Sequence, residues 1–172
     1  MSEQTKRKIN LKIYPIYRML SFDLLFYWAV IFLFLTQVKG MSAAQILLID
    51  AFFPIFQVMF QLLCVAISDH IGKRKSLIIG NLFRSGGILM LIIGNGIYAY
   101  LICDIVIAFG YVLTEMCGPT LLDDSIPEGE HKSNIFTRIE GKGTSHYFAL
   151  AAISSIITGF LYTANPYIPI IL

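Results

Sequence analysis

The chain has 172 residues, of which 56% are hydrophobic and only 14% are charged. Soluble domains carry roughly 25% charged residues, so this composition leaves too little polar surface for a soluble domain and is typical of a membrane protein. The bases behind the net charge of +2 cluster between apolar segments without interleaved aromatic residues, which argues against a nucleic-acid partner.

Five apolar segments are long enough to cross a bilayer, which takes about 20 mainly apolar residues. Their approximate ranges are 19–38, 44–67, 76–93, 98–118 and 144–163. A sixth apolar segment, 166–172, reaches only about 10 Å at 1.5 Å per residue, a third of the bilayer. Residues 1–172 are therefore predicted to form an all-α membrane protein, a polytopic transmembrane helix bundle with five complete spans and the start of a sixth.

The first apolar segment follows a basic N-terminus, as a signal peptide does. It is too long for a signal peptide and no small-x-small cleavage site follows it, so we interpret it as a retained membrane anchor.

The bases are distributed asymmetrically about these spans. If the N-terminus is cytoplasmic, Lys39 lies outside and Arg84 lies within a span. The bases on the cytoplasmic side are then Lys6, Arg7, Lys8, Lys12, Arg18, Lys73, Arg74, Lys75, Lys132, Arg138 and Lys142. This arrangement follows the positive-inside rule. It predicts an integral, multi-pass protein of the cell membrane that is surrounded by lipid and has a cytoplasmic N-terminus.

Polar side chains within the spans fall on stripes along the helices. At 100° per residue, those of the second span lie within about 40° of one another and those of the fourth within about 60°, while the first span has a looser stripe. Ionisable groups in a bilayer are costly and usually face a bundle interior or an aqueous cavity. The candidates for a substrate or proton path are Asp23, Asp50, Gln57, Gln61, Asp104, Tyr111 and Glu115.

Simpler roles remain open for several of these residues. Asp50 and Glu115 are expected near opposite membrane surfaces, where they could face lipid headgroups or bond a neighbouring helix. Asp23 could pair with Arg18, and Arg84 could extend to the surface or pair with an acid.

No pattern of catalytic, metal-binding or cofactor-binding residues stands out. Cys64, Cys103 and Cys117 lie in apolar segments without Cys-x-x-Cys spacing and are interpreted as small buried hydrophobic residues. The acidic loop after the fourth span lacks the spacing of a calcium loop and is interpreted as a solvated connector. A membrane aspartyl protease needs two acids at one depth, whereas Asp23 and Asp104 are expected at opposite depths. We expect no cofactor and no enzymatic activity.

The segment between the second and third spans, "SDHIGKRKSL" (68–77), carries one acid and three consecutive bases. It resembles the signature loop of the major facilitator superfamily, Gly-x-x-x-Asp-Arg/Lys-x-Gly-Arg/Lys-Arg/Lys. "FFPIFQVMFQLLCVAISDH" and "FTRIEGKG" also resemble that family's second helix and its approach to the fifth. The matching residues of the loop are Asp69, Gly72, Lys73 and Arg74, while Val65 and His70 stand in place of the first Gly and the first base.

The resemblance covers essentially the whole chain and implies the N-terminal six-helix half of a secondary transporter, with the second bundle absent. In this family two such bundles surround a central cavity and rock between inward and outward openings. The loop acid is thought to bond to the second bundle and hold one state, which makes Asp69 a candidate latch and Lys73 and Arg74 its scaffold. A simpler alternative is that Asp69 caps its own helix or neutralises the bases.

The chain departs from the family's proton-coupled drug exporters. Those proteins often carry an Arg in the fourth helix and a Gly-Pro pair in the fifth, whereas this fourth span has no base and the fifth has Ser154 and Ser155. Sugars, peptides, organic ions and metabolites all remain candidate solutes.

We therefore expect a secondary transporter that moves a small solute by alternating access, with a proton or another cation as a candidate coupling ion. The chain would be its truncated N-terminal half, inactive without the C-terminal half. The alternative is a half-length membrane protein that acts as a partner or regulator without transport of its own.

Overall fold

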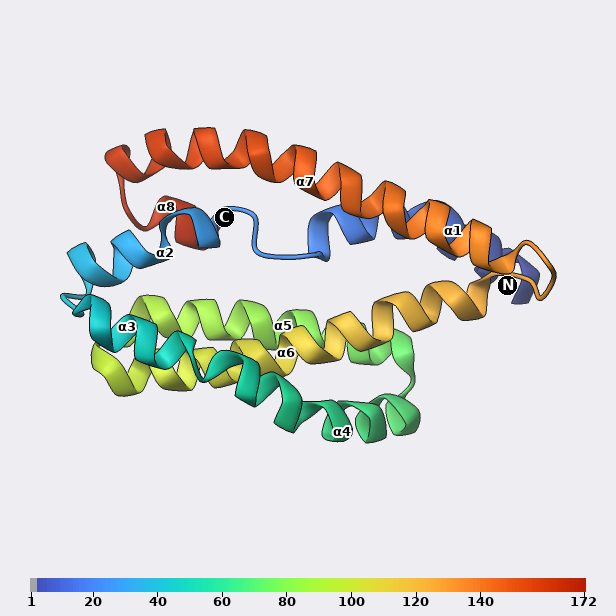
Figure 1. Ribbon diagram of the computed structural model, residues 1–172, viewed down its shortest axis with the longest axis horizontal. Helices are drawn as coiled ribbons and strands as arrows, with labels where there is room; N and C mark the ends of the chain where they lie inside the picture. Colours follow the sequence, from blue (N-terminus) through green and yellow to red (C-terminus); the bar gives the residue numbers. More distant parts are fainter. Residues whose placement is uncertain (1–2) are drawn as a thin grey trace.

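The computed structural model describes residues 3–172. In that range the chain is almost entirely helical and contains no strand (Figure 1). In chain order the elements are α1 Glu3–Ser21, α2 Tyr27–Leu33, the π-helix η1 Phe34–Val38, α3 Ala43–Asp50, α4 Phe53–Ile71, α5 Lys73–Ile93, α6 Gly96–Ser125, α7 Lys132–Ala164 and α8 Ile168–Ile171. Within the described residues, four helical stretches are long and apolar enough to cross a membrane: Ala43–Ile71, Lys73–Ile93, Gly96–Ser125 and Lys132–Ala164. The prediction of an all-α membrane bundle is confirmed.

The first apolar segment is not one continuous helix. The range 19–38, expected as a single span, holds the end of α1, an irregular stretch at 22–26, then α2 and η1. Hydropathy gives no sign of this break because the residues on both sides of Asp23 are apolar. In an apolar environment the backbone groups freed by such a break need partners elsewhere in the protein. Those partners belong to the site described below.

The second apolar segment is also divided. Its first part, α3, has eight residues and begins with a capping box, in which Ser42 and Gln45 bond each other's backbone N–H groups. A short turn at 51–52 separates α3 from α4. Pro54 lies in the first turn of α4 and has no N–H to donate to the carbonyl of Asp50. Ala51 and Phe52 nevertheless keep helical φ and ψ values, and their N–H groups bond to the carbonyls of Leu47 and Ile49, so the helical path continues through this turn.

Helices α5 and α6 lie side by side along their length (Figure 1). A Cβ atom added at Gly110 would lie 2.5 Å from the carbonyl oxygen of Gly80 and 2.8 Å from the backbone nitrogen of Arg84. A Cβ atom at Gly80 would lie 2.7 Å from the Thr114 side chain. Glycine at both positions therefore lets the two backbones approach closely, as small residues do in membrane bundles.

Gly110→Ala should destabilise the bundle by about 1–3 kcal/mol, because the added methyl group meets backbone atoms that cannot move aside. The thermal unfolding midpoint in detergent measures this loss. Gly86→Ala is the matched control, since a Cβ atom at Gly86 on α5 has nothing within 4 Å. Equal midpoints for the two variants would contradict the close contact.

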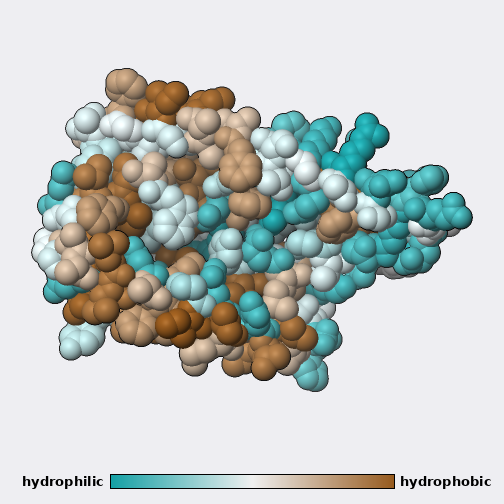
Figure 2. All heavy atoms as spheres, in the orientation of Figure 1, coloured by the Kyte–Doolittle hydropathy of each residue, from teal (hydrophilic) through white to brown (hydrophobic). Residues whose placement is uncertain are grey.

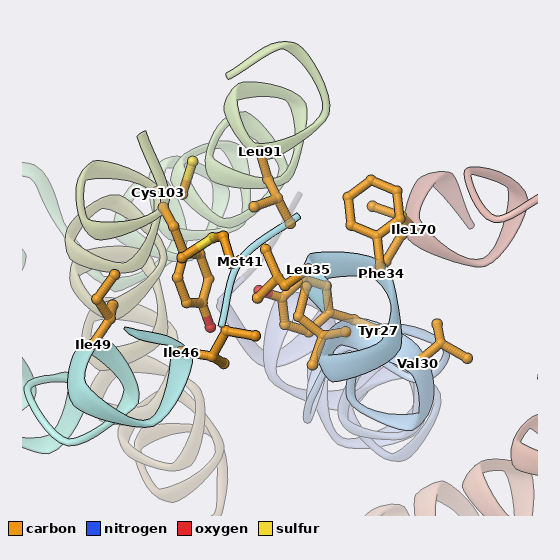
Figure 3. Packing of buried hydrophobic residues seen from close by; sticks show 12 residues of the cluster. Tyr27, Val30, Phe34, Leu35, Met41, Ile46, Ile49, Leu91, Cys103 and Ile170 are labelled. Atoms are coloured by element: carbon orange, nitrogen blue, oxygen red, sulfur yellow. The ribbon is translucent and has the colours of Figure 1, made fainter. Parts of the chain in front are cut away.

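The elements form two layers (Figure 1). One layer contains α1, α2, α7 and α8, and the other contains α3, α4, α5 and α6. A cluster of buried apolar side chains joins the layers near one end (Figure 3). This distal cluster includes Tyr27, Phe34, Leu35, Ile46, Ile49, Leu91, Tyr100, Cys103 and Ile170.

The two ends of the bundle differ in polarity. The basic end contains the start of α1, the loop 126–131 and the turn 68–77, a name used here for the end of α4, Gly72 and the start of α5 (Figure 1). The distal end contains residues 39–42, 94–95 and 165–167. Hydrophilic residues gather at the basic end and hydrophobic residues cover much of the rest of the face in view (Figure 2). At the distal end, Lys39 Nζ donates to the carbonyl oxygens of Ile92 and Gly94 at 2.8 and 2.7 Å, which caps the end of α5.

Candidate functional site

In the turn 68–77, Lys73 and Arg74 bond to neighbouring helices, whereas Asp69 bonds to no described residue. Lys73 donates to Asp124 near the end of α6, and Arg74 Nη2 donates to Asn10 Oδ1 on α1 at 2.7 Å. Asp69 is exposed and has no hydrogen bond or ion pair with any described residue. No contact therefore supports the alternative in which Asp69 caps its helix or neutralises the bases.

Gly72 gives this turn its shape. It lies between α4 and α5 with φ 87° and ψ 145°, close to a region that essentially only glycine populates. A Cβ atom there would meet nothing within 4 Å, so the requirement for glycine comes from the backbone alone.

Gly72→Ala should cost about 1–3 kcal/mol of backbone strain and lower the thermal unfolding midpoint. Gly129→Ala in the exposed loop is the matched control, because Gly129 also has open space around it but no positive φ. Equal unfolding midpoints for the Gly72 and Gly129 variants would show that alanine at position 72 causes no backbone strain.

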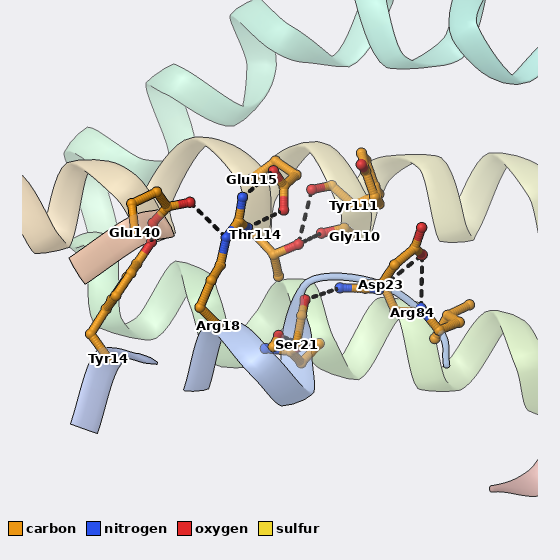
Figure 4. A network of polar contacts seen from close by, with 12 residues as sticks. Tyr14, Arg18, Ser21, Asp23, Arg84, Gly110, Tyr111, Thr114, Glu115 and Glu140 are labelled. Carbon is orange, nitrogen blue, oxygen red and sulfur yellow. Dashed lines mark hydrogen bonds and ion pairs between the residues drawn. The ribbon is translucent and has the colours of Figure 1, made fainter. Parts of the chain in front are cut away.

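Arg84 contacts two residues at the break in the first apolar segment, Ser21 and Asp23. Its Nη1 donates to the carbonyl oxygen of Ser21 at 2.8 Å, and its Nη2 lies 3.6 Å from Asp23 Oδ1 (Figure 4). Asp23 Oδ1 also accepts from the backbone N–H of Leu24 at 2.8 Å and from Trp28 Nε1 at 2.9 Å. Of the partners considered from the sequence, Asp23 therefore pairs with Arg84 and not with Arg18.

Arg18 instead joins three helices near the basic end. Its Nη1 and Nη2 donate to the Glu115 carboxylate of α6 at 2.5 and 3.2 Å, and its Nε forms an ion pair with Glu140 of α7 at 2.7 Å. Tyr14, one turn earlier on α1, donates to Glu140 Oε2 at 2.5 Å (Figure 4). Glu115 thus bonds a neighbouring helix, which is one of the simpler roles considered for it from the sequence.

Tyr14, Arg18, Glu115 and Glu140 form a cluster in which the two acids change the pKa values of Tyr14 and Arg18. Burial raises the pKa of the Tyr14 hydroxyl far above its ordinary value, and the hydrogen bond to Glu140 adds to the effect. Burial alone would lower the pKa of Arg18, but the hydrogen bond and charge of Glu115 raise it above its ordinary value. Both groups therefore keep their protons at physiological pH.

A polar cavity lies between α4 and α6. Gln57 and Gln61 from α4 meet Tyr111 and Glu115 from α6 around a volume of about 150 Å³, and the apolar side chains of Val112 and Met116 complete its lining. Phe53 packs edge-on against Tyr111, and the Arg84 guanidinium lies 5.6 Å from the centre of the Tyr111 ring. Hydrogen-bond donors and acceptors therefore line one cavity. Arg84 contacts both Tyr111 of this cavity and Ser21 at the break in the first apolar segment.

Two further acids lie toward the distal end. Tyr100 Oη of α6 donates to Asp50 Oδ1 of α3 at 2.6 Å. Asp104, one turn along α6 from Tyr100, is only 5% exposed, and its Oδ2 has no hydrogen-bond partner among the described residues. Asp50 has a protein partner although its residue is exposed.

The seven path candidates thus divide into separate groups. Gln57, Gln61, Tyr111 and Glu115 share a cavity, Asp23 lies beside them through Arg84, and Asp50 and Asp104 lie apart. Sequence reasoning did not identify the cluster partners Tyr14 and Glu140. A partial signal existed, since Tyr14 and Arg18 are four residues apart and so share one face of a helix.

Among the side chains that the structure describes, no three His, Cys, Asp or Glu lie close enough to hold a metal ion. The three cysteines are free and buried, in line with their interpretation as small hydrophobic residues.

The family model of the Major Facilitator Superfamily matches the chain over residues 14–171. No curated protein and no solved structure matches the chain.

Proposed function

The chain belongs to the major facilitator superfamily, and from this premise we propose that it is one six-helix bundle of a secondary transporter that moves a small solute by alternating access. Family membership and the four apolar helices make it an integral, multi-pass membrane protein. The proposed partners are the solute, the surrounding lipid and a second six-helix bundle.

We orient the basic end toward the cytoplasm of a cell membrane. The start of α1, which carries Arg7, Lys8 and Lys12, and the turn 68–77 lie at that end, whereas the connection 39–42 lies at the distal end (Figure 1). The positive-inside rule supports this orientation. The proposed spans are the five apolar segments 19–38, 44–67, 76–93, 98–118 and 144–163, with the first one interrupted at 22–26.

The observation that carries the proposal is the polar cavity between α4 and α6. Gln57, Gln61, Tyr111 and Glu115 offer amide, hydroxyl and carboxylate groups on two mostly apolar helices. Such groups fix the orientation of a small ligand in a mostly apolar site. The broken first segment beside them is also characteristic of transporters, where interrupted helices border the binding site near the middle of the membrane.

We assign the turn 68–77 to the control of the cycle. Lys73 and Arg74 are bound to α6 and α1 and so hold the turn in place, while Asp69 stays exposed. An exposed carboxylate at the end of a helix is able to bond to the N-terminus of a helix in the second bundle in one state and to let go in the other.

Solute counterflow in proteoliposomes tests the function. The complete transporter, with this chain and its second bundle, is reconstituted and offered a mass-spectrometric panel of sugars, peptides, organic ions and metabolites. We expect exchange of one solute class through the complete transporter and none through the 172-residue chain alone. Stable insertion without exchange of any panel member would favour the alternative, a regulatory membrane protein.

A further inference from the structure

Of the described residues that line the polar cavity between α4 and α6, Glu115 alone is charged. Its side chain remains 26% exposed although Arg18 binds it. The amides of Gln57 and Gln61 and the hydroxyl of Tyr111 form no hydrogen bond with any described residue, so they are free to bond to a ligand. The cavity therefore offers a ligand one carboxylate and three neutral polar groups.

The polar contacts behind this cavity contain more acids than bases (Figure 4). Arg18 is shared between two carboxylates, because both its Nη atoms donate to Glu115 while its Nε lies 2.7 Å from Glu140. Arg84 and Asp23 form a separate pair at 3.6 Å. Three acids thus face two bases, and the remaining charge is negative. A bound cation would offset this charge, whereas a bound anion would add to it.

Aromatic rings lie along one side of the cavity. Tyr111 lines it, Phe53 packs edge-on against Tyr111 at 6.3 Å, and Trp28 packs edge-on against Phe53 at 6.4 Å. The faces of such rings attract cations. The Arg84 guanidinium, 5.6 Å from the centre of the Tyr111 ring, already makes an interaction of this kind. The rings therefore favour the same class of ligand as the charges do.

We propose that the transported solute is an organic cation and that its positively charged head group occupies this cavity, with Glu115 as its counter-charge. The amide oxygens of Gln57 and Gln61 accept hydrogen bonds from an ammonium group, and the Tyr111 ring attracts the methyl groups of a quaternary one. A cavity of about 150 Å³ holds a group about as large as benzene, and the trimethylammonium head of choline is of similar size. The inference rests on the proposed transport function and names the class of its solute.

A pair of ligands with the same shape tests the charge. Choline carries a trimethylammonium group, and neohexyl alcohol carries a tert-butyl group in its place. Each ligand is titrated into the purified complete transporter, and the rise of the thermal unfolding midpoint with ligand concentration gives its affinity. We expect choline to bind about tenfold more tightly than the alcohol, or more, because a hydrogen bond or contact to a charged group is worth at least that factor.

The other results of this titration would overturn the proposal. Equal affinities for choline and neohexyl alcohol would show that the cavity does not recognise charge. Absence of choline binding would show that it holds no cationic head group. Tighter binding of the anion of tert-butylacetic acid, which has the same shape, would assign the solute to the anions.

Glu115→Gln tests the counter-charge. The change leaves Arg18 and Glu140 as a one-to-one ion pair, so the variant should fold. We expect its affinity for choline to fall about tenfold or more while its affinity for the alcohol changes less than about twofold. Glu115→Asp keeps the charge and should keep the preference for choline. Glu130→Gln, which removes an exposed acid at the basic end, should change neither affinity. Equal losses for both ligands in Glu115→Gln would give Glu115 a structural role and contradict the proposal.

Solute counterflow separates this inference from the proposed function. Exchange of a sugar or an anionic metabolite, with no exchange of any organic cation, would overturn the inference and leave the transport function in place. Absence of exchange for every member of the panel would contradict the transport function. Choline binding that depends on Glu115 would in that case still identify the cavity as a site for organic cations.

Discussion

Asp69→Asn should abolish solute exchange by the complete transporter while the amount of protein in the membrane stays the same. Asp69 is exposed and bonds to no described residue, so its replacement removes no contact within this bundle. Asparagine keeps the size of the side chain but loses the negative charge that binds a helix N-terminus or a base. Counterflow of the identified solute, together with quantitative immunoblotting of the membrane fraction, measures the two quantities.

Glu130→Gln is the matched control for Asp69→Asn. Glu130 is also an exposed acid at the basic end, and the change removes the same charge. Exchange should stay within about twofold of the wild type in this control, because isolated surface charges contribute little. Normal exchange in Asp69→Asn would remove the latch role from this residue.

Arg18→Met should destabilise the bundle by about 3 kcal/mol, the lower end of the range for removal of one partner from a buried charge pair. Glu115 and Glu140 would keep their negative charges without the guanidinium that now lies between them. The lower end applies because their side chains are 26% and 20% exposed and so retain some contact with water. The thermal unfolding midpoint in detergent measures the loss.

The origin of this loss can be checked by removing the other charges. Addition of Glu115→Gln and Glu140→Gln to Arg18→Met should recover most of the stability, because a neutral cluster has no uncompensated charge. Lys12→Met, which removes an exposed base from the same helix, should change the midpoint little. A triple variant no more stable than Arg18→Met would show that the guanidinium acts through packing and not through its charge.

Hydropathy locates the apolar part of each helix but not where the helix ends. The expected spans 98–118 and 144–163 lie inside α6, Gly96–Ser125, and α7, Lys132–Ala164. Both helices continue into polar sequence at the basic end because backbone hydrogen bonding does not stop where lipid contact does. Conversely, a run of apolar side chains does not guarantee a helix, as the break at 22–26 shows.

Spacing within one helix predicts which side chains share a face, but not what they meet. Gln57 and Gln61, like Tyr111 and Glu115, are four residues apart, so each pair was expected on one stripe. The cavity between the two pairs follows from the packing of α4 on α6. Ion pairs between residues far apart in the sequence are even harder to predict. Arg18 and Glu115 are 97 positions apart, and nothing in the sequence indicates that Arg18 pairs with Glu115 and not with Asp23.

Trp28 is the only tryptophan in the chain, and it stands at the break in the first apolar segment. Its indole N–H bonds to Asp23, and its ring lies edge-on to Tyr27 and Phe53. Tryptophan fluorescence of the unlabelled bundle therefore comes from a single point, which Phe53 joins to Tyr111 of the cavity. A change in its emission colour or quenching on addition of a compound would give an optical screen for ligands before any flux is measured.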